Sequence, residues 1–344
     1  FEMHAIYDSR QTLHKPQTRI AGGVLRPNLE QPDRIASFQR ALERMKIETV
    51  APAERGDAGI RAVHDKDYLV FLETGYDEWR KLPDVGPELR VSAHPNVYMN
   101  RLPRNFIGRA GYYQADAGCV MLEGTWEAVR ASAMTAIEAA QRVVDGERAS
   151  YALCRPPGHH AYADKAGGFC FINNTAVAAE LARTKADRVA ILDVDVHHGN
   201  GTQTIFYDRP DVLHVSIHGD PADLYPFYAG YADERGAGKG EGANLNIPVA
   251  LQNGNDVYCE AVDRGIDAVK QYGADILVIA LGLDAATDDP FACMRVDRDG
   301  FSGMGEHIGA LKLPTIIVQE GGYLSTNLEH NFEAFMRGFL QRHR

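Results

Sequence analysis

Long hydrophobic runs are missing from this 344-residue chain: no stretch approaches the ~18 consecutive apolar residues that a membrane-spanning helix needs. The first residues also lack the basic segment and apolar stretch of a secretory signal. We therefore expect no membrane partner and a cytoplasmic location.

Cysteine is scarce and shows no metal-binding or disulfide spacing. The five cysteines are Cys119, Cys154, Cys170, Cys259 and Cys293. They are scattered, their number is odd and no C-x-x-C pair occurs, so neither a disulfide framework nor a thiolate zinc site is indicated. We expect reduced cysteines that pack in the core.

Positive charge is in deficit as well. The sequence has 36 Lys and Arg against 47 Asp and Glu, a formal net charge of −11. This balance disfavours a nucleic-acid partner. A negative field concentrates small cationic substrates around a protein, although acidity that serves only solubility explains the charge equally well.

Internal repeats, low-complexity linkers and composition breaks are absent, so we predict a single domain over residues 1–344. Short β-rich runs alternate with helical patterns, which is typical of an α/β fold with a mainly parallel sheet of about eight strands and helices on both faces. The predicted strands are 5–7, 47–50, 150–153, 189–192, 212–216, 245–249, 276–280 and 315–318. The predicted helices are 33–46, 64–74, 126–145, 173–184, 257–272, 299–310 and 328–342.

Residues 81–109 do not fit this alternation, because they contain four prolines and no sustained hydrophobic period. Irregular segments of this length are usually functional or disordered. A lid, an oligomer contact and a mobile excursion are all compatible with this composition.

Candidate metal-binding and catalytic side chains cluster in the segment Asp193-Val-Asp195-Val-His197-His198-Gly199-Asn200-Gly201, which follows a nearly unbroken apolar strand. Since strand side chains alternate, residues 193, 195 and 197 share one face. Ligands of open α/β sheets bind at this carboxyl end of the strands.

Three further clusters also follow predicted strands: 155–160 with two histidines, 167–174, and the pair 281–284 and 320–323. Asp195, His197 and Asp284 would give a metal one nitrogen and two carboxylate ligands, which suits zinc with an open position for water and substrate. Ferrous iron accepts the same ligands. Such a metal can turn water into a nucleophile near neutral pH.

Two other groups complete this chemistry. His159 and His160, on a Pro-Gly loop, would handle protons, each held by a second group that fixes its tautomer. Tyr323, beside a glycine pair, would donate its hydroxyl to an oxyanion.

Five motifs occur in one order along the chain: RPPGHH at 155–160, GGFCFINN at 167–174, DVDVHHGNG at 193–201, LGLD at 281–284 and EGGY at 320–323. In these five motifs and their order, the chain resembles the zinc-dependent deacetylase branch of the arginase/deacetylase family, most closely the bacterial acetylpolyamine amidohydrolases. The resemblance implies metal-dependent hydrolysis of the acetyl amide of N-acetylated polyamines such as acetylputrescine, acetylcadaverine and acetylspermidine, which are small cationic acetylated amines.

The resemblance also implies individual roles. Asp195, His197 and Asp284 bind zinc, and Tyr323 holds the oxyanion. His159 pairs with Asp193, and His160 pairs with Asn200. Since a charged partner keeps a histidine more basic than a neutral partner does, we predict that His160 takes the proton of the water and that His159 stabilises charge.

Structural potassium is implied in the same way. One ion would lie near Asp193 and Ser216, with carbonyls of Asp195, His197 and Ile217. A second would use the carbonyls of Phe206, Arg209, Val212 and Ala243.

For the substrate channel, the resemblance assigns Phe169 and Tyr225 as the two aromatic walls, with Gly168 beside them. It identifies residues 81–109 as an insertion that forms a homodimer and narrows the channel mouth. The sequence departs from the family where acidic groups for distal ammoniums are expected, because it has Ile107 and Gly118 there. Asp116 is the nearest carboxylate.

Three alternatives were compared with this prediction. A two-manganese ureohydrolase is disfavoured, since Gly199 and Gly282 stand where its bridging carboxylates are required. A protein or peptide acetyl-lysine deacetylase would use the same chemistry behind a different channel mouth. A non-enzymatic module that binds acetylated amines would be expected to lack a catalytic group, and none is missing.

Overall fold

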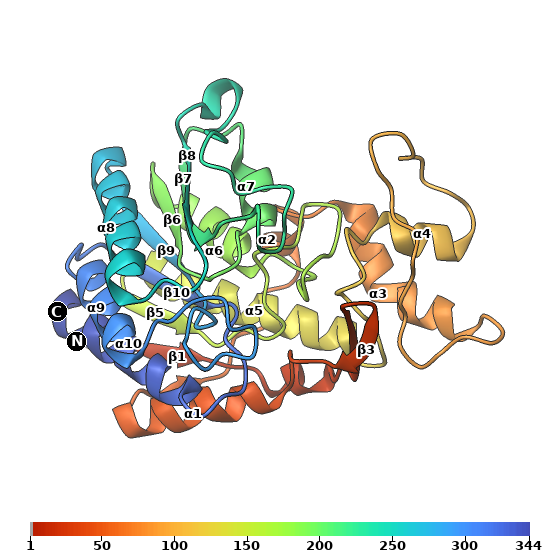
Figure 1. Ribbon diagram of the computed structural model, residues 1–344, viewed down its shortest axis with the longest axis horizontal. Helices are drawn as coiled ribbons and strands as arrows, with labels where there is room; N and C mark the ends of the chain where they lie inside the picture. The colour runs from red at the N-terminus through yellow and green to blue at the C-terminus, as the bar shows by residue number, and fades with distance from the viewer. Residues whose placement is uncertain (1–2) are drawn as a thin grey trace.

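The computed structural model describes residues 3–344, so the first two residues of the predicted domain lie outside it. Its centre is an eight-stranded parallel sheet with the order β4-β1-β5-β10-β9-β6-β7-β8 (Figure 1). The strands are β1 (His4–Ile6), β4 (Thr49–Val50), β5 (Ala149–Ala152), β6 (Val189–Asp193), β7 (Val212–Gly219), β8 (Asn244–Val249), β9 (Ile276–Leu281) and β10 (Thr315–Gln319). The predicted fold class is confirmed, and every predicted strand is present.

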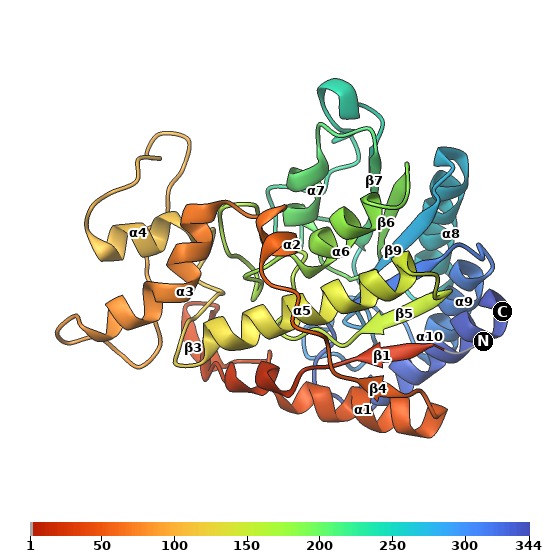
Figure 2. The ribbon, with the colours of Figure 1, turned by 180° about the vertical axis from the view of Figure 1, so that it is seen from behind.

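Helices cover both faces of the sheet, as Figures 1 and 2 show from opposite sides. One face carries α1 (Asp33–Met45), α8 (Asn255–Tyr272), α9 (Arg298–Gly309) and α10 (Leu328–His343). The other carries α2 (Ala58–Arg61), α3 (Lys66–Arg80), α5 (Thr125–Val144) and α6 (Asn174–Arg183). Between residues 3 and 344, no helix has both the length and the apolar character required to cross a membrane.

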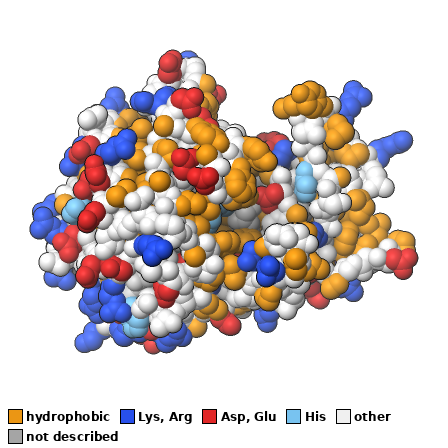
Figure 3. Space-filling model, in the orientation of Figure 1, with side chains coloured by type: hydrophobic (Ala, Val, Ile, Leu, Met, Phe, Trp, Pro, Cys, Tyr) orange, Lys and Arg blue, Asp and Glu red, His pale blue; other side chains and the backbone are white. Residues whose placement is uncertain are grey.

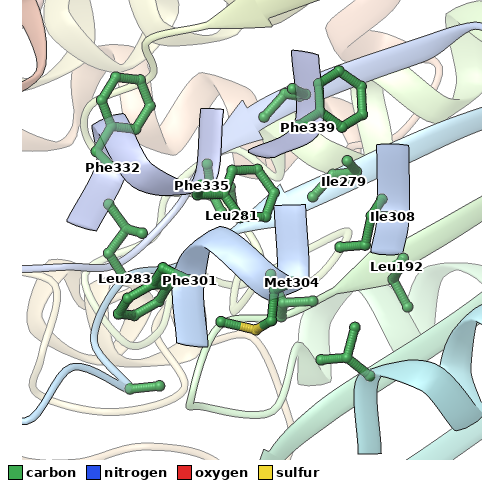
Figure 4. Packing of buried hydrophobic residues seen from close by; sticks show 14 of the residues in the cluster. Leu192, Ile279, Leu281, Leu283, Phe301, Met304, Ile308, Phe332, Phe335 and Phe339 are labelled. Carbon is green, nitrogen blue, oxygen red and sulfur yellow. The ribbon is translucent and has the colours of Figure 1, made fainter. Parts of the chain in front are cut away.

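Two hydrophobic cores lie on opposite sides of the sheet because neighbouring strand residues point in opposite directions. In β9, Ile279 belongs to one core and Val278 to the other. Figure 4 shows the first core, to which Phe301 of α9, Phe335 of α10 and Leu281 of β9 contribute side chains. Burial on both faces explains why these strands read as continuous apolar runs.

Several short elements escaped the sequence analysis. They are the antiparallel hairpin of β2 (Thr18–Ala21) and β3 (Val24–Pro27), the helices α4 (Phe106–Tyr112) and α7 (Asn200–Phe206), the short helix α2, and the 3₁₀ turns η1 (Ser9–Leu13) and η2 (Gly238–Gly240). The pair Gly22-Gly23 between two short runs is a recognised two-residue hairpin signal, so the hairpin could have been found.

The irregular segment 81–109 projects from the main body, and α4 begins inside it at Phe106 (Figure 1). A single backbone bridge between Leu89 and Met121 ties it back to the chain before α5. Few regular hydrogen bonds hold this segment, in agreement with its lack of hydrophobic period.

Candidate active site

The predicted clusters meet because their strands are neighbours. β5, β10, β9 and β6 are adjacent in the sheet and parallel, so their carboxyl ends lie at one edge. β5 leads to the two histidines, β10 to Tyr323, β9 to Asp284 and β6 to Asp195. Sheet order, which sequence reasoning did not supply, thereby assembles one site from four distant segments.

Asp195, His197 and Asp284 form a compact, buried group. One ligand atom from each lies within 4.8 Å of the others. His197 Nδ1 is 3.0 Å from Asp284 Oδ2 and 3.4 Å from Asp195 Oδ1. Two buried carboxylates at this distance repel each other unless a cation neutralises them, so the donor set fits a divalent metal.

The backbone around this group is held by the same carboxylates. Gly321 N–H donates to Asp195 Oδ2 at 2.8 Å, and Val196 N–H donates to Asp284 Oδ1 at 3.1 Å. These bonds fix the orientation of both side chains before any ion binds, which is how supporting contacts tune a metal site.

Glycines close the space that a second metal would need. A Cβ on Gly282 would lie 2.2 Å from Asp195 Oδ2 and 2.5 Å from Asp195 Cα. A Cβ on Gly199 would lie 2.4 Å from Asp193 Oδ2. A carboxylate side chain at either position would require rearrangement of the site, so the geometry favours one metal.

The two histidines have different partners. His159 Nδ1 is 2.8 Å from Asp193 Oδ2, and His160 Nδ1 is 2.6 Å from Asn200 Oδ1. Their ring centres are 4.1 Å apart. The structure therefore brings together all four residues of the predicted pairs, one with a charged partner and one with a neutral partner.

These surroundings set opposite basicities. Burial by itself would lower the pKa of His159, but Asp193, Asp195 and Glu320 outweigh it and raise the pKa above its usual range. Burial lowers the pKa of His160 well below its usual range, and the neighbouring His159 and His197 lower it further. A neutral His160 beside a cationic His159 is the state this arrangement favours.

Tyr323 lies close to the candidate metal ligands and to an arginine. The Arg34 guanidinium carbon is 4.8 Å from the centre of the tyrosine ring, and Arg34 donates to the carbonyls of Gly322 and Glu320 at 2.5 and 2.7 Å. Burial raises the pKa of Tyr323 well above its usual range. The phenol therefore stays protonated and can donate a hydrogen bond.

Glu320 was not predicted as a site residue, although it begins the EGGY motif. Its fully buried carboxylate accepts hydrogen bonds from Gly158 N–H at 2.7 Å, His159 N–H at 3.0 Å and Thr175 Oγ at 2.6 Å. It thus ties the histidine loop to the end of β10. A charged residue directly after a mainly apolar strand was the sequence signal for this role.

A cavity of about 510 Å³ opens onto these residues. His160, His197 and Tyr323 line its inner end. The predicted Gly168, Phe169, Tyr225 and Asp116 also line it, together with Arg19, Ile20, Ala21, Gly22, Ala117, Gly118, Phe227 and Phe291. The hairpin residues, Phe227 and Phe291 were not predicted, because only the tertiary fold carries them to the cavity.

The predicted aromatic pair flanks the reactive groups. The Tyr225 ring centre is 5.0 Å from that of His160, and the Phe169 ring centre is 6.1 Å from that of Tyr323. Gly168 adopts a φ of +53°, and a Cβ there would lie 2.4 Å from His160 Cδ2. Glycine is therefore required where the channel wall passes the histidine.

Asp116 is engaged by the channel wall. Its carboxylate accepts from Gly118 N–H at 2.7 Å, Gly168 N–H at 3.2 Å and Tyr225 Oη at 2.6 Å. Its predicted contact with a distal ammonium stays a prediction. Ile107, which lies on α4, does not line the cavity.

The residues assigned to potassium lie near the neighbouring strands β6 and β7. Asp193 and Ser216 are paired across these strands, and Ser216 Oγ is 2.8 Å from His218 Nδ1. In the second set, the Phe206 carbonyl accepts from Arg209 N–H and the Ala243 carbonyl from His214 N–H, both at 3.0 Å. Neither potassium assignment is tested by these contacts.

Comparison with known proteins agrees with this geometry. Residues 28–339 match the histone deacetylase domain family. The chain is 46% identical over 333 residues to the acetylpolyamine amidohydrolase of Burkholderia pseudomallei, which covers 96% of each protein. It is 41% identical over 347 residues to acetylpolyamine amidohydrolase 2 of Pseudomonas aeruginosa, over 99% of this chain and 100% of that one.

Among solved structures, the acetylpolyamine aminohydrolase from Burkholderia pseudomallei superposes with a TM-score of 0.97 at 45% identity, over 99% of both chains. Sequence, fold and the position of the buried Asp-His-Asp group thus agree with one assignment. This chain is a member of the histone deacetylase domain family, and it is similar over nearly its whole length to bacterial acetylpolyamine amidohydrolases.

Proposed function

We propose that this protein hydrolyses the acetyl amide of N-acetylated polyamines, acetylputrescine, acetylcadaverine and acetylspermidine among them, and releases acetate and the free amine. The observation that carries the proposal is the convergence of Asp195, His197 and Asp284 with two histidines and Tyr323 at the inner end of a cavity. Near full-length similarity to acetylpolyamine amidohydrolases supports the substrate class.

Asp195, His197 and Asp284 would hold a single divalent metal, zinc with ferrous iron as the alternative, and this ion would supply Lewis-acid activation of water and of the amide carbonyl. Asp195 and Asp284 stay oriented through their bonds to Gly321 and Val196 N–H. The metal supplies no other chemistry in this proposal.

His160 would act as the general base and then as the general acid. Its Nδ1–H donates to Asn200 Oδ1, so the lone pair of Nε2 is left to accept a proton from the attacking water. As the carbonyl carbon gains the water oxygen, the C–N bond weakens. His160 then returns the proton to the leaving nitrogen, and the amine departs.

Two groups would stabilise charge during this step. His159, protonated beside Asp193, lies with its Nε2 3.7 Å from Asp195 Oδ1 and offsets the buried carboxylates. Tyr323 would donate its hydroxyl to the developing oxyanion, an interaction that strengthens as negative charge accumulates on the oxygen.

The channel supports a thin, flexible substrate. Phe169 and Tyr225 present apolar walls on which a methylene chain can pack.

We assign the whole chain to one catalytic domain and place it in the cytoplasm, and the free state of all five cysteines supports that location.

Steady-state hydrolysis of acetylputrescine, acetylcadaverine and acetylspermidine, compared with an acetyl-lysine peptide, tests the substrate. The proposal expects the highest kcat/KM for an acetylated polyamine. Much faster turnover of the peptide than of every acetylpolyamine would instead assign protein or peptide deacetylation. Absence of hydrolysis by the metal-loaded protein would favour a binding module.

Metal content gives a second test. We expect one zinc or iron per chain, loss of hydrolysis on chelation and its recovery on metal addition. Asp284→Asn should lower the bound metal measured by elemental analysis.

Potassium at the two proposed sites predicts a higher Tm in a potassium salt than in the salt of a large organic cation at equal ionic strength.

We also propose a homodimer that the insertion builds. Val97, Tyr98 and Met99 are 85%, 92% and 65% exposed on this projecting segment. Figure 3 shows hydrophobic side chains over the projection at the right of the view. Exposed apolar groups of this size usually mark an interface. Sedimentation should give a dimer, and Tyr98→Glu should shift it toward monomer.

A further inference from the structure

Arg19 lines the cavity beside Ile20, which is 51% exposed, whereas His160 and Tyr323 are buried, so we place Arg19 at the outer part of the cavity. It belongs to β2 of the hairpin that the sequence analysis missed, and its side chain is among those that line the cavity. Its guanidinium carbon is 5.6 Å from the ring centre of Phe291. That ring centre is in turn 5.1 Å from the ring of Tyr323 and 5.3 Å from the ring of His197. One aromatic ring therefore separates this positive charge from the reactive groups.

The Arg19 side chain has no anionic partner. Among residues 3–344, no hydrogen bond or ion pair involves its guanidinium, and its Nε is buried without an acceptor. Arg90 Nε is also buried without a partner, but its Nη2 donates to the carbonyl and to the hydroxyl of Thr18 and lies 3.6 Å from Glu88 Oε2. A buried donor without an acceptor is costly, and a ligand that supplies an acceptor relieves that cost.

The single carboxylate that lines the described cavity does not balance Arg19. Asp116 already accepts the hydrogen bonds of Gly118, Gly168 and Tyr225. It is committed to the channel wall and holds Gly168 against His160. The Asp116 carboxylate thus already accepts three hydrogen bonds, whereas the Arg19 guanidinium has no acceptor and offers its donors to a substrate.

We propose that Arg19 determines specificity at the outer end of the channel. It selects linear N-acetylated amines that carry a hydrogen-bond acceptor, a carboxylate or a carbonyl, at the depth of its guanidinium, and it disfavours an ammonium there. The inference rests on the amide hydrolysis proposed above and narrows its substrates. Acetylcadaverine remains a substrate under this proposal, but a slower one than a linear amide of similar length with an uncharged or anionic end, and acetylated polyamines whose next nitrogen extends past Arg19 are less affected.

The overall negative charge of the chain does not cancel this selection. A net charge of −11 draws cations toward the protein over long range, and salt screens that attraction. Arg19 acts at contact distance in a partly buried cavity, where screening is weaker. The net negative charge therefore favours encounter with cationic substrates, whereas Arg19 favours acceptor groups once a substrate is inside the cavity.

Three substrates of similar length and different end groups test the proposal: N-acetylcadaverine with an ammonium, N-pentylacetamide with a methyl group and acetamidohexanoate with a carboxylate. For the wild type we expect kcat/KM to rise in that order, with a difference on the order of tenfold between the two charged ends. Arg19→Gln should remove most of that difference, and Arg19→Glu should reverse the order.

Arg26→Gln is the matched control, since Arg26 is the cross-strand neighbour of Arg19 and does not line the cavity. It should leave the order unchanged. A wild type that prefers N-acetylcadaverine, with the same ratio in Arg19→Glu, would overturn the proposal. Calorimetric Kd values for the three compounds measure the same order without turnover, so a protein that discriminates but does not hydrolyse would refute only the proposed function.

Discussion

His160 donates its Nδ1–H to the side-chain oxygen of Asn200 over 2.6 Å, whereas the adjacent His159 faces the carboxylate of Asp193. The two imidazoles differ mainly in the charge of this partner. His160→Ala should therefore lower kcat by about a thousandfold through loss of the general base. The loss of kcat in His159→Ala should be smaller than this by a factor of about ten or more. Steady-state kinetics at saturating substrate measure both, and equal losses contradict the proposed roles.

Asn200→Asp gives His160 a charged partner without moving its position. A second carboxylate raises the pKa of His160, so the acidic limb of the kcat/KM profile should shift to higher pH. An unchanged profile with normal metal content would show that His160 does not titrate in catalysis.

Tyr323→Phe should lower kcat by about a hundredfold to a thousandfold, because the oxyanion loses one donor, while KM changes little. The ring keeps its packing against Phe291 and Arg34, so Tm and metal content should match the wild type. A variant with normal kcat would remove Tyr323 from the proposed mechanism.

Glu320→Gln retains an acceptor for the Gly158 and His159 N–H groups but removes a buried negative charge. Charge-assisted hydrogen bonds exceed neutral ones by about 1 kcal/mol, so kcat should fall by about fivefold with KM unchanged. Thr175→Val, which removes only the donor to the other carboxylate oxygen, should cost less. Losses confined to KM would argue against a positioning role.

Gly282→Ala should lower both stability and metal content. The added Cβ would lie 2.2 Å from Asp195 Oδ2 and 2.5 Å from Asp195 Cα, and the backbone at this distance cannot move without displacing a proposed metal ligand. We expect a loss of about 1–3 kcal/mol in the free energy of unfolding. Gly303→Ala is the control, since a Cβ there meets nothing within 4 Å on helix α9, and it should be neutral or stabilising.

His64 makes stability depend on pH. Burial lowers its pKa to about 4, against an ordinary value of 6.5, and its Nε2 accepts Asn173 N–H. The unfolded chain therefore binds more protons between these values, so stability is highest above pH 6.5 and falls as the pH drops toward 4. The fully developed loss is on the order of 3 kcal/mol.

His64→Gln should remove this contribution, because glutamine does not titrate. Urea unfolding at several pH values should show that the free energy of unfolding falls less steeply with decreasing pH in the variant than in the wild type. Above about pH 7, the difference in this free energy between the two proteins should change little with pH. Parallel pH profiles for the two proteins would show that folding does not lower the pKa of His64.

Some features were readable from sequence because they depend on neighbours along the chain. Strands 189–193 and 276–281 are continuous apolar runs, and burial on both faces of a parallel sheet requires such runs. Strand alternation predicted that Asp195 and His197 share a face, although β6 ends at Asp193 and the two residues lie in the bend that follows it. The motifs that end these strands are short, so their residues could be named without knowledge of the fold.

The pairing of distant residues was accessible only through resemblance or structure. Nothing local places His160 beside Asn200, or Glu320 below Gly158, since these contacts depend on strand order and on the path of the loops. Arg19 and Phe291 lie more than two hundred residues apart and meet at one cavity. Local hydrophobic period carries no information about such contacts.

The sequence by itself therefore determined the class of fold, the identity of the chemical groups and, through Gly199 and Gly282, the improbability of a second metal. Tertiary structure alone decided which groups share the cavity and which of them keep an unpaired charge. The physical reason is that local period reports burial and side-chain direction, whereas sheet order and loop packing set the distances on which charge, coordination and specificity depend.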